Sequence, residues 1–199
     1  MMKIYSPRAA ARFLQRHSGD IEDISSRSGL PAACLRAVLY KELTEIDLMD
    51  LAADAVVRCN QRRLAEPGAG GGFLRKCDSS TGCGQIFGFV AINAINFAVD
   101  RGLTDCAALG LPTDHRPDAQ NMADLRLVWG RLHDEPVFNM ECTALNLLAA
   151  AEEMTGRIDF PGYSPEELKL VFTRYNGNFK DVSPYGEATY AIYQRYAKT

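Results

Sequence analysis

Long apolar runs are largely missing from this sequence of 199 residues. No stretch approaches the roughly 20 apolar residues that a transmembrane helix needs. The first 17 residues, MMKIYSPRAAARFLQRH, contain no apolar core of signal-peptide length. We therefore expect no membrane span and synthesis in the cytoplasm.

The chain also lacks an excess of basic charge. It has 22 Lys and Arg residues against 25 Asp and Glu residues, which gives a formal net charge of −3 at pH 7. Such a chain has no overall positive field that would attract nucleic acid or an anionic membrane. We predict no nucleic-acid partner, although local basic patches stay open.

Patterns that bind metals are scarce as well. The three histidines, His17, His115 and His133, are scattered and have no Cys or Asp at ligand or triad spacing, so we interpret them as surface residues. Cys77 and Cys83 lack the Cys-x-x-Cys spacing, and a disulfide between them stays open. Free thiols are expected at the cysteines in apolar helical patterns: Cys34, Cys59, Cys106 and Cys142. We predict no metal and no cofactor.

Helix start and stop signals recur along the chain, while strand signals are few. Three Ser-Pro pairs, beginning at Ser6, Ser164 and Ser183, each combine an N-cap with a first-turn proline, and Gly29 and Gly156 are expected C-caps. We predict a mainly α protein with one domain over 1–199, in which 1–18 form an N-terminal helical region. Further helices are expected over 20–28, 31–43, 46–64, 89–99, 118–132, 137–155, 165–176 and from 184 onward.

Glu42 is the first candidate for chemistry. It follows Leu35, Val38 and Leu39 at helical spacing, so it lies on the apolar stripe of the helix over 31–43. Burial disfavours a charged carboxylate and raises its pKa, which leaves a proton to donate near neutral pH. The alternative is an acid at the edge of the stripe that pairs with a neighbouring Lys or Arg.

A glycine-rich segment over 66–86 is the second candidate. It begins with EPGAGGG and ends with DSSTGCGQI, which predicts an ordered loop or a short hairpin. Its small residues let backbone approach a ligand, and its hydroxyl and amide groups can bond sugar. We expect the segment to line a polar groove through the side chains of Ser79, Ser80, Thr81 and Gln85.

The order of LRAVLYKEL, STGCGQI, RYNGN and EATYAIYQRY resembles that of lytic transglycosylases of the SLT type and goose-type lysozymes. The resemblance implies a lysozyme-like helical domain that cleaves the glycan strands of peptidoglycan, with Glu42 as general acid. It places the hydroxyl of Ser79 or Ser80 near the acid and Gln85 in the groove. It also gives site roles to residues near the C terminus: Tyr175, Asn176 and, on the last helix, Tyr190.

One interval is longer than is usual in this family. Ser79 lies 37 positions after Glu42, and the predicted helix over 46–64 fills the difference. We expect that helix to pack on the core through Met49 and through Val56 or Val57.

The number of catalytic carboxyls stays open. A hydrolase needs a second carboxyl at about 5–5.5 Å or 6.5–9.5 Å from the first, whereas a lytic transglycosylase uses one acid because a hydroxyl of the substrate attacks. Asp78 is our candidate for the second carboxyl, ahead of Asp47 and Asp50. The implied partners are peptidoglycan or a related polysaccharide, with an inhibitor or immunity protein as a further candidate. Action at the cell wall or periplasm would follow release or secretion.

Two other functions remain as alternatives. A wall-binding protein could keep the fold without catalysis. The segment over 23–43, with Gly29 at its turn, also resembles a DNA-binding helix-turn-helix, in which Glu42 would only end a helix.

Overall fold

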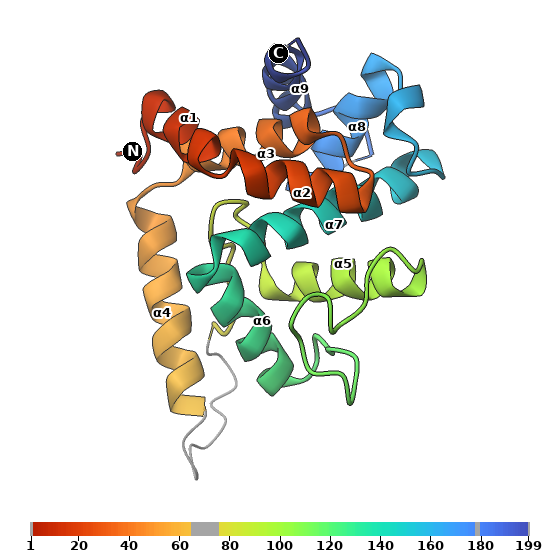
Figure 1. Ribbon diagram of the computed structural model, residues 1–199. Coiled ribbons are helices and arrows are strands. Elements are labelled where there is room, and N and C mark those ends of the chain that lie inside the picture. The colour runs from red at the N-terminus through yellow and green to blue at the C-terminus, as the bar shows by residue number, and fades with distance from the viewer. Residues whose placement is uncertain (1, 65–75, 178–179, 199) are drawn as a thin grey trace.

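Residues 2–64, 76–177 and 180–198 are described by the computed structural model (Figure 1). These residues form nine α-helices and one short 3-10 turn, and they contain no named strand, so the predicted mainly α class is confirmed. The α-helices are α1 (Pro7–Arg16), α2 (Ser18–Ser28), α3 (Ala32–Glu45), α4 (Leu48–Leu64), α5 (Gly88–Asp100), α6 (Met122–Asp134), α7 (Pro136–Thr155), α8 (Pro165–Asn176) and α9 (Pro184–Tyr196).

Most helix ends carry the expected signals. The side chains of Ser6, Ser164 and Ser183 each accept a hydrogen bond from a backbone N–H of the first turn, and Gly29 and Gly156 adopt the left-handed conformation at C-caps. The start of α6 differs from the expected residue 118. Residues 118–121 form a turn, and the helix begins only after Asn121, whose side chain accepts from the N–H of Ala123.

The core is built around α3 and α7. Helix α3 packs against α1, α2, α7 and α9, while α7 packs against α2, α3, α5, α6 and α8. Figure 1 shows α7 crossing the middle of the molecule between α2 and α5. Fully buried side chains come from both helices, among them Leu35 and Leu39 of α3 and Phe138 and Met140 of α7. Helix α3 is therefore held on several sides.

Helix α4 extends from the end of α3 along one side of the molecule (Figure 1). Val57 is buried as expected, but the prediction for Met49 is wrong, since Met49 is 65% exposed. The inward face is largely polar: Asp54 and Gln61 are buried, and the Gln61 amide donates to the backbone oxygen of Cys77 at 2.8 Å. Helix α4 is therefore held by hydrogen bonds as well as by apolar packing.

The four cysteines that were expected to be free thiols are free. Cys34 and Cys142 are buried, Cys106 is half-buried and Cys59 is exposed, and none of these four is oxidised. Cys83 is also a free thiol, so the disulfide with Cys77 is not formed. None of the helices in the described part of the chain combines the length and apolarity needed to cross a membrane.

Candidate active site

Glu42 lies in the last turn of α3 and is only 9% exposed. Its pKa is raised to about 7, chiefly by burial and in smaller part by the negative charges of Glu45 and Asp50, while the positive charge of Lys41 opposes the rise. The Tyr185 hydroxyl donates a hydrogen bond to Oε1 of Glu42, which opposes the rise. In a large fraction of the molecules, the Glu42 carboxyl therefore keeps its proton near neutral pH.

The Glu42 carboxyl lines an open cavity of about 340 Å³, which we call the acid groove. Segments far apart in the sequence form it: the end of α3, the start of α4, the segment over 80–87 and the end of α8. Four residues predicted from the sequence meet Glu42 there, namely Ser80, Gln85, Tyr175 and Asn176. The other lining residues are Glu45, Asp47, Asp50 and Phe87. The groove is thus polar and acidic.

The segment over 81–86 forms the tight turn of the groove wall. Thr81 and Ile86 pair as an isolated antiparallel bridge, with N–H to O distances of 3.2 Å in both directions. Gln85 adopts a φ of +46°, which is uncommon for a residue with a side chain. Its amide donates to the Gly82 oxygen at 2.9 Å. The described part of the predicted segment is thus a tight turn closed by one bridge, without a named strand, while residues 66–75 of the predicted loop lie outside the described residues.

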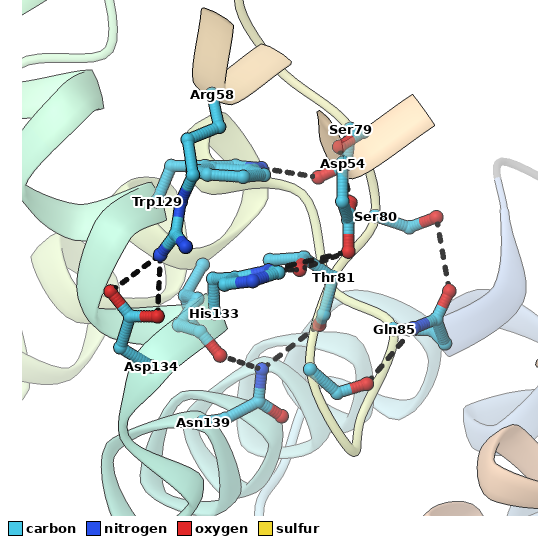
Figure 2. A network of polar contacts seen from close by, with 12 residues as sticks. Asp54, Arg58, Ser79, Ser80, Thr81, Gln85, Trp129, His133, Asp134 and Asn139 are labelled. Carbon is cyan, nitrogen blue, oxygen red and sulfur yellow. Dashed lines mark hydrogen bonds and ion pairs between the residues drawn. The ribbon is translucent and has the colours of Figure 1, made fainter. Parts of the chain in front are cut away.

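Asn139 of α7 anchors this turn. Its Oδ1 accepts from the N–H of Gly84 at 2.7 Å. Its amide donates to the oxygen of Thr81 at 3.0 Å, as Figure 2 shows. A Cβ at Gly84 would lie 2.0 Å from Oγ1 of Thr143, so only glycine fits there. The small residues of the segment allow close packing against α7.

Tyr175 closes the groove from α8. Its hydroxyl donates to the Gly84 oxygen at 2.6 Å. Burial raises the pKa of Tyr175 and of Tyr185 well above the ordinary value, and the charge of Glu42 raises both further. Both phenols therefore stay protonated donors. Tyr175 fixes the turn, whereas Tyr185 bonds the acid itself.

Two predicted groove residues, Ser79 and Thr81, lie elsewhere. Figure 2 shows both side chains directed at Asp54 of α4, while Ser80 between them points towards Gln85. Ser79 donates to Oδ1 of Asp54 at 2.8 Å and Thr81 donates to Oδ2 at 2.7 Å. Both side chains are buried. Of the three residues Ser79, Ser80 and Thr81, only Ser80 lines the groove.

Asp78 also lies outside the groove. Its two oxygens accept from the N–H groups of Gly88 at 2.8 Å and Phe89 at 3.0 Å, at the start of α5. Burial raises the pKa of Asp78, and these two hydrogen bonds oppose the rise. Asp78 caps a helix in this structure, so it is not positioned as a second catalytic carboxyl.

The last helix presents Tyr185 to the site in place of Tyr190. The ring of Tyr190 packs on that of Tyr193 with centroids 5.8 Å apart, and Nζ of Lys169 lies 5.6 Å from its centroid. Sequence reasoning missed Tyr185 because three later tyrosines share helical spacing. Its place directly after Ser183-Pro184, in the first turn of α9, was the available signal.

Metal ligands do not gather in the described residues, which contain no group of three or more His, Cys, Asp and Glu able to hold an ion. The site is an acid site built from carboxyl, hydroxyl and amide groups. No protein-family model, curated protein or solved structure matches this chain significantly.

Proposed function

We propose that this protein cleaves the glycan strands of peptidoglycan, or of a related polysaccharide, in a lysozyme-like helical domain with Glu42 as general acid. The observation that carries the proposal is a buried carboxyl, with a pKa raised to about 7, that opens on a polar groove. Breaking a glycosidic bond requires a proton on the leaving oxygen, and a raised carboxyl pKa supplies it.

The hydrogen bonds around Glu42 support a defined role for each oxygen. Oε1 accepts from Tyr185, and within the described residues Oε2 has no bonded partner. We therefore assign to Oε2 the proton that is donated to the leaving group. Tyr185 acts as a positioning residue, because its hydroxyl bonds the carboxyl and Tyr185 is not among the residues that line the groove.

The acidic edge of the groove suits the charge that develops in the reaction. Cleavage passes through a transition state with positive charge on the sugar ring. Asp47 and Asp50 line the groove. One oxygen of each accepts a hydrogen bond from a backbone N–H at the start of α4, at 2.8 Å for Asp47 and 2.9 Å for Asp50. Their negative charge stabilises the positive sugar.

The position of Asp78 favours the mechanism with one acid. Both of its oxygens accept hydrogen bonds from backbone N–H groups, so this candidate for the second carboxyl is already used to cap a helix. Glu42 is then the remaining catalytic carboxyl. After it donates its proton to the leaving oxygen, its carboxylate takes the proton of the substrate hydroxyl that attacks the sugar, as in lytic transglycosylases. If water attacks instead, Asp50 becomes the carboxyl that activates it.

Digestion of purified peptidoglycan tests the proposal. We expect clearing by the natural protein and almost none by Glu42→Gln, which keeps the size and a hydrogen-bond acceptor for Tyr185. Mass spectrometry of the products should show anhydro ends. Reducing ends would indicate attack by water, and equal clearing by both proteins would remove Glu42 from the mechanism. Wall binding without any clearing would instead support the non-catalytic alternative.

The DNA-binding alternative is disfavoured by the burial of α3. A recognition helix must present one face to the major groove. In α3, seven of the 14 residues are buried, and α1, α2, α7 and α9 pack around it. A mobility-shift assay with duplex DNA at low salt should show no binding.

A further inference from the structure

A second cavity lies beside the acid groove, between α4, the N-terminal segment and the turn over 82–85. Its volume is about 220 Å³, which exceeds the roughly 150 Å³ of an engineered cavity that binds benzene. Mostly apolar side chains line it, including Phe13, Leu43 and Leu51. We call it the apolar pocket. Helix α4, which occupies the lengthened interval after Glu42, supplies one of its walls.

One wall of the apolar pocket carries polar groups that are held in place. Asp54 and His133 both line it, and Figure 2 shows them joined through Thr81. Nδ1 of His133 lies 2.9 Å from Oγ1 of Thr81 and 3.3 Å from Oδ2 of Asp54. The imidazole stacks on Trp129, with centroids 5.2 Å apart and planes at 16°. The Trp129 N–H donates to the oxygen of Ser79 at 3.0 Å.

These contacts fix which nitrogen of His133 carries the hydrogen when the imidazole is neutral. The Thr81 hydroxyl donates its one hydrogen to a hydrogen bond with Asp54, so it can only accept from His133. Nδ1 therefore carries the hydrogen, and Nε2 carries a lone pair. Within the described residues Nε2 has no bonded partner, and the side chain is 28% exposed. His133 thus offers one acceptor nitrogen in the wall of the apolar pocket.

We propose that the apolar pocket binds a small ring or branched alkyl group that carries one O–H or N–H donor. The apolar part displaces water from the side chains of Phe13, Leu43 and Leu51, and the donor bonds Nε2 of His133. A pocket of mainly apolar walls with one oriented polar group is the usual form of a small-molecule site. This inference does not depend on glycan cleavage.

Phenol and toluene are matched probes, because they share size and shape and differ in the hydroxyl. Titration of the full chain by calorimetry should show phenol binding about five- to tenfold more tightly than toluene, the usual net value of one hydrogen bond. Phenol should also shift the ¹⁵N resonance of Nε2, and toluene should not. Equal affinities, or no binding of either probe, would overturn the proposal.

Two substitutions on α4 locate the site. Leu51→Trp should fill the pocket and abolish phenol binding, whereas Val56→Trp, at a position of the same helix that does not line the pocket, should leave it unchanged. His133→Phe should reduce phenol affinity to that of toluene. Phenol binding that survives Leu51→Trp would place the ligand elsewhere. Glu42→Gln should bind phenol normally, so loss of clearing and loss of phenol binding are separate results.

Discussion

Glu42 and Asp54 are two buried carboxyls on opposite sides of the segment over 79–86, and they differ in what their oxygens accept. Asp54 is 6% exposed and receives one hydroxyl on each oxygen, with His133 nearby. Glu42 is 9% exposed and receives a single hydroxyl on Oε1. Burial alone therefore does not define a reactive acid. The number of donors separates Asp54, which holds two neighbouring hydroxyls in place, from Glu42, which accepts one hydroxyl and lines the acid groove.

The largest expected difference between the two carboxyls is in catalysis. Glu42→Gln should lower the rate of peptidoglycan cleavage by about 10²- to 10⁴-fold, the usual contribution of a general acid. Cleavage by the natural protein should fall as the pH rises above about 7, because Glu42 then loses its proton. Turbidity loss measured between pH 5 and pH 9 checks both effects. A rate that stays flat across this range would contradict the assignment.

The free energy of unfolding, in contrast, should depend more on Asp54 than on Glu42. Asp54→Ala leaves the buried hydroxyls of Ser79 and Thr81 without an acceptor, which should cost about 4 kcal/mol of the free energy of unfolding. Urea denaturation measures the loss. The control is Asp134→Ala, which breaks an exposed ion pair with Arg58 and should cost less than about 1 kcal/mol. Similar losses for both variants would remove the structural role of Asp54.

The buried Glu42 should make stability depend on pH. Its pKa is about 7 in the folded chain and 4.5 in the reference state, so folding favours the protonated form. This contribution to stability is fully present below about pH 4.5 and is lost as the pH rises to about 7. Glu42→Gln should therefore stabilise the protein by about 3 kcal/mol at pH 8 and by almost nothing at pH 4. Thermal unfolding at the two pH values checks this, and an equal effect at both would contradict it.

Tyr185 should tune the acid without replacing it. Its hydrogen bond lowers the pKa of Glu42, so Tyr185→Phe should move the alkaline fall of activity to higher pH. The lost orientation should also slow cleavage several-fold. Tyr190→Phe, on the same helix, is the matched control and should leave the pH profile unchanged. A profile that moves with Tyr190 would mean that the two tyrosines had been assigned the wrong way round.

The smallest effect concerns the segment that separates the two carboxyls. Gln85 has a φ of +46°, a conformation that costs a residue with a Cβ about 1 kcal/mol. Gln85→Gly should therefore be more stable than Gln85→Ala by about 1 kcal/mol, because both lose the side-chain amide and only glycine relaxes the backbone. Chemical denaturation of the pair measures the difference.

Local signals made the helices predictable, and the position of Glu42 followed from its apolar stripe. The hydroxyls over 79–81 show where this reasoning stopped. Side chains along an extended segment alternate in direction, so Ser79 and Thr81 face Asp54 while Ser80 faces the groove. Treating the three as one set hid that alternation. Asp54 itself could not be found, because α4 turns a partly polar face inward, against the usual pattern.

Asp50 and Gln85 line both cavities, so the acid groove and the apolar pocket share a partition. A ligand in one cavity that displaces either residue changes the shape of the other cavity. Thermodynamic reciprocity then requires each occupant to alter the affinity of the other by the same factor. Occupants of the two cavities are thus linked to the extent that both move Asp50 or Gln85.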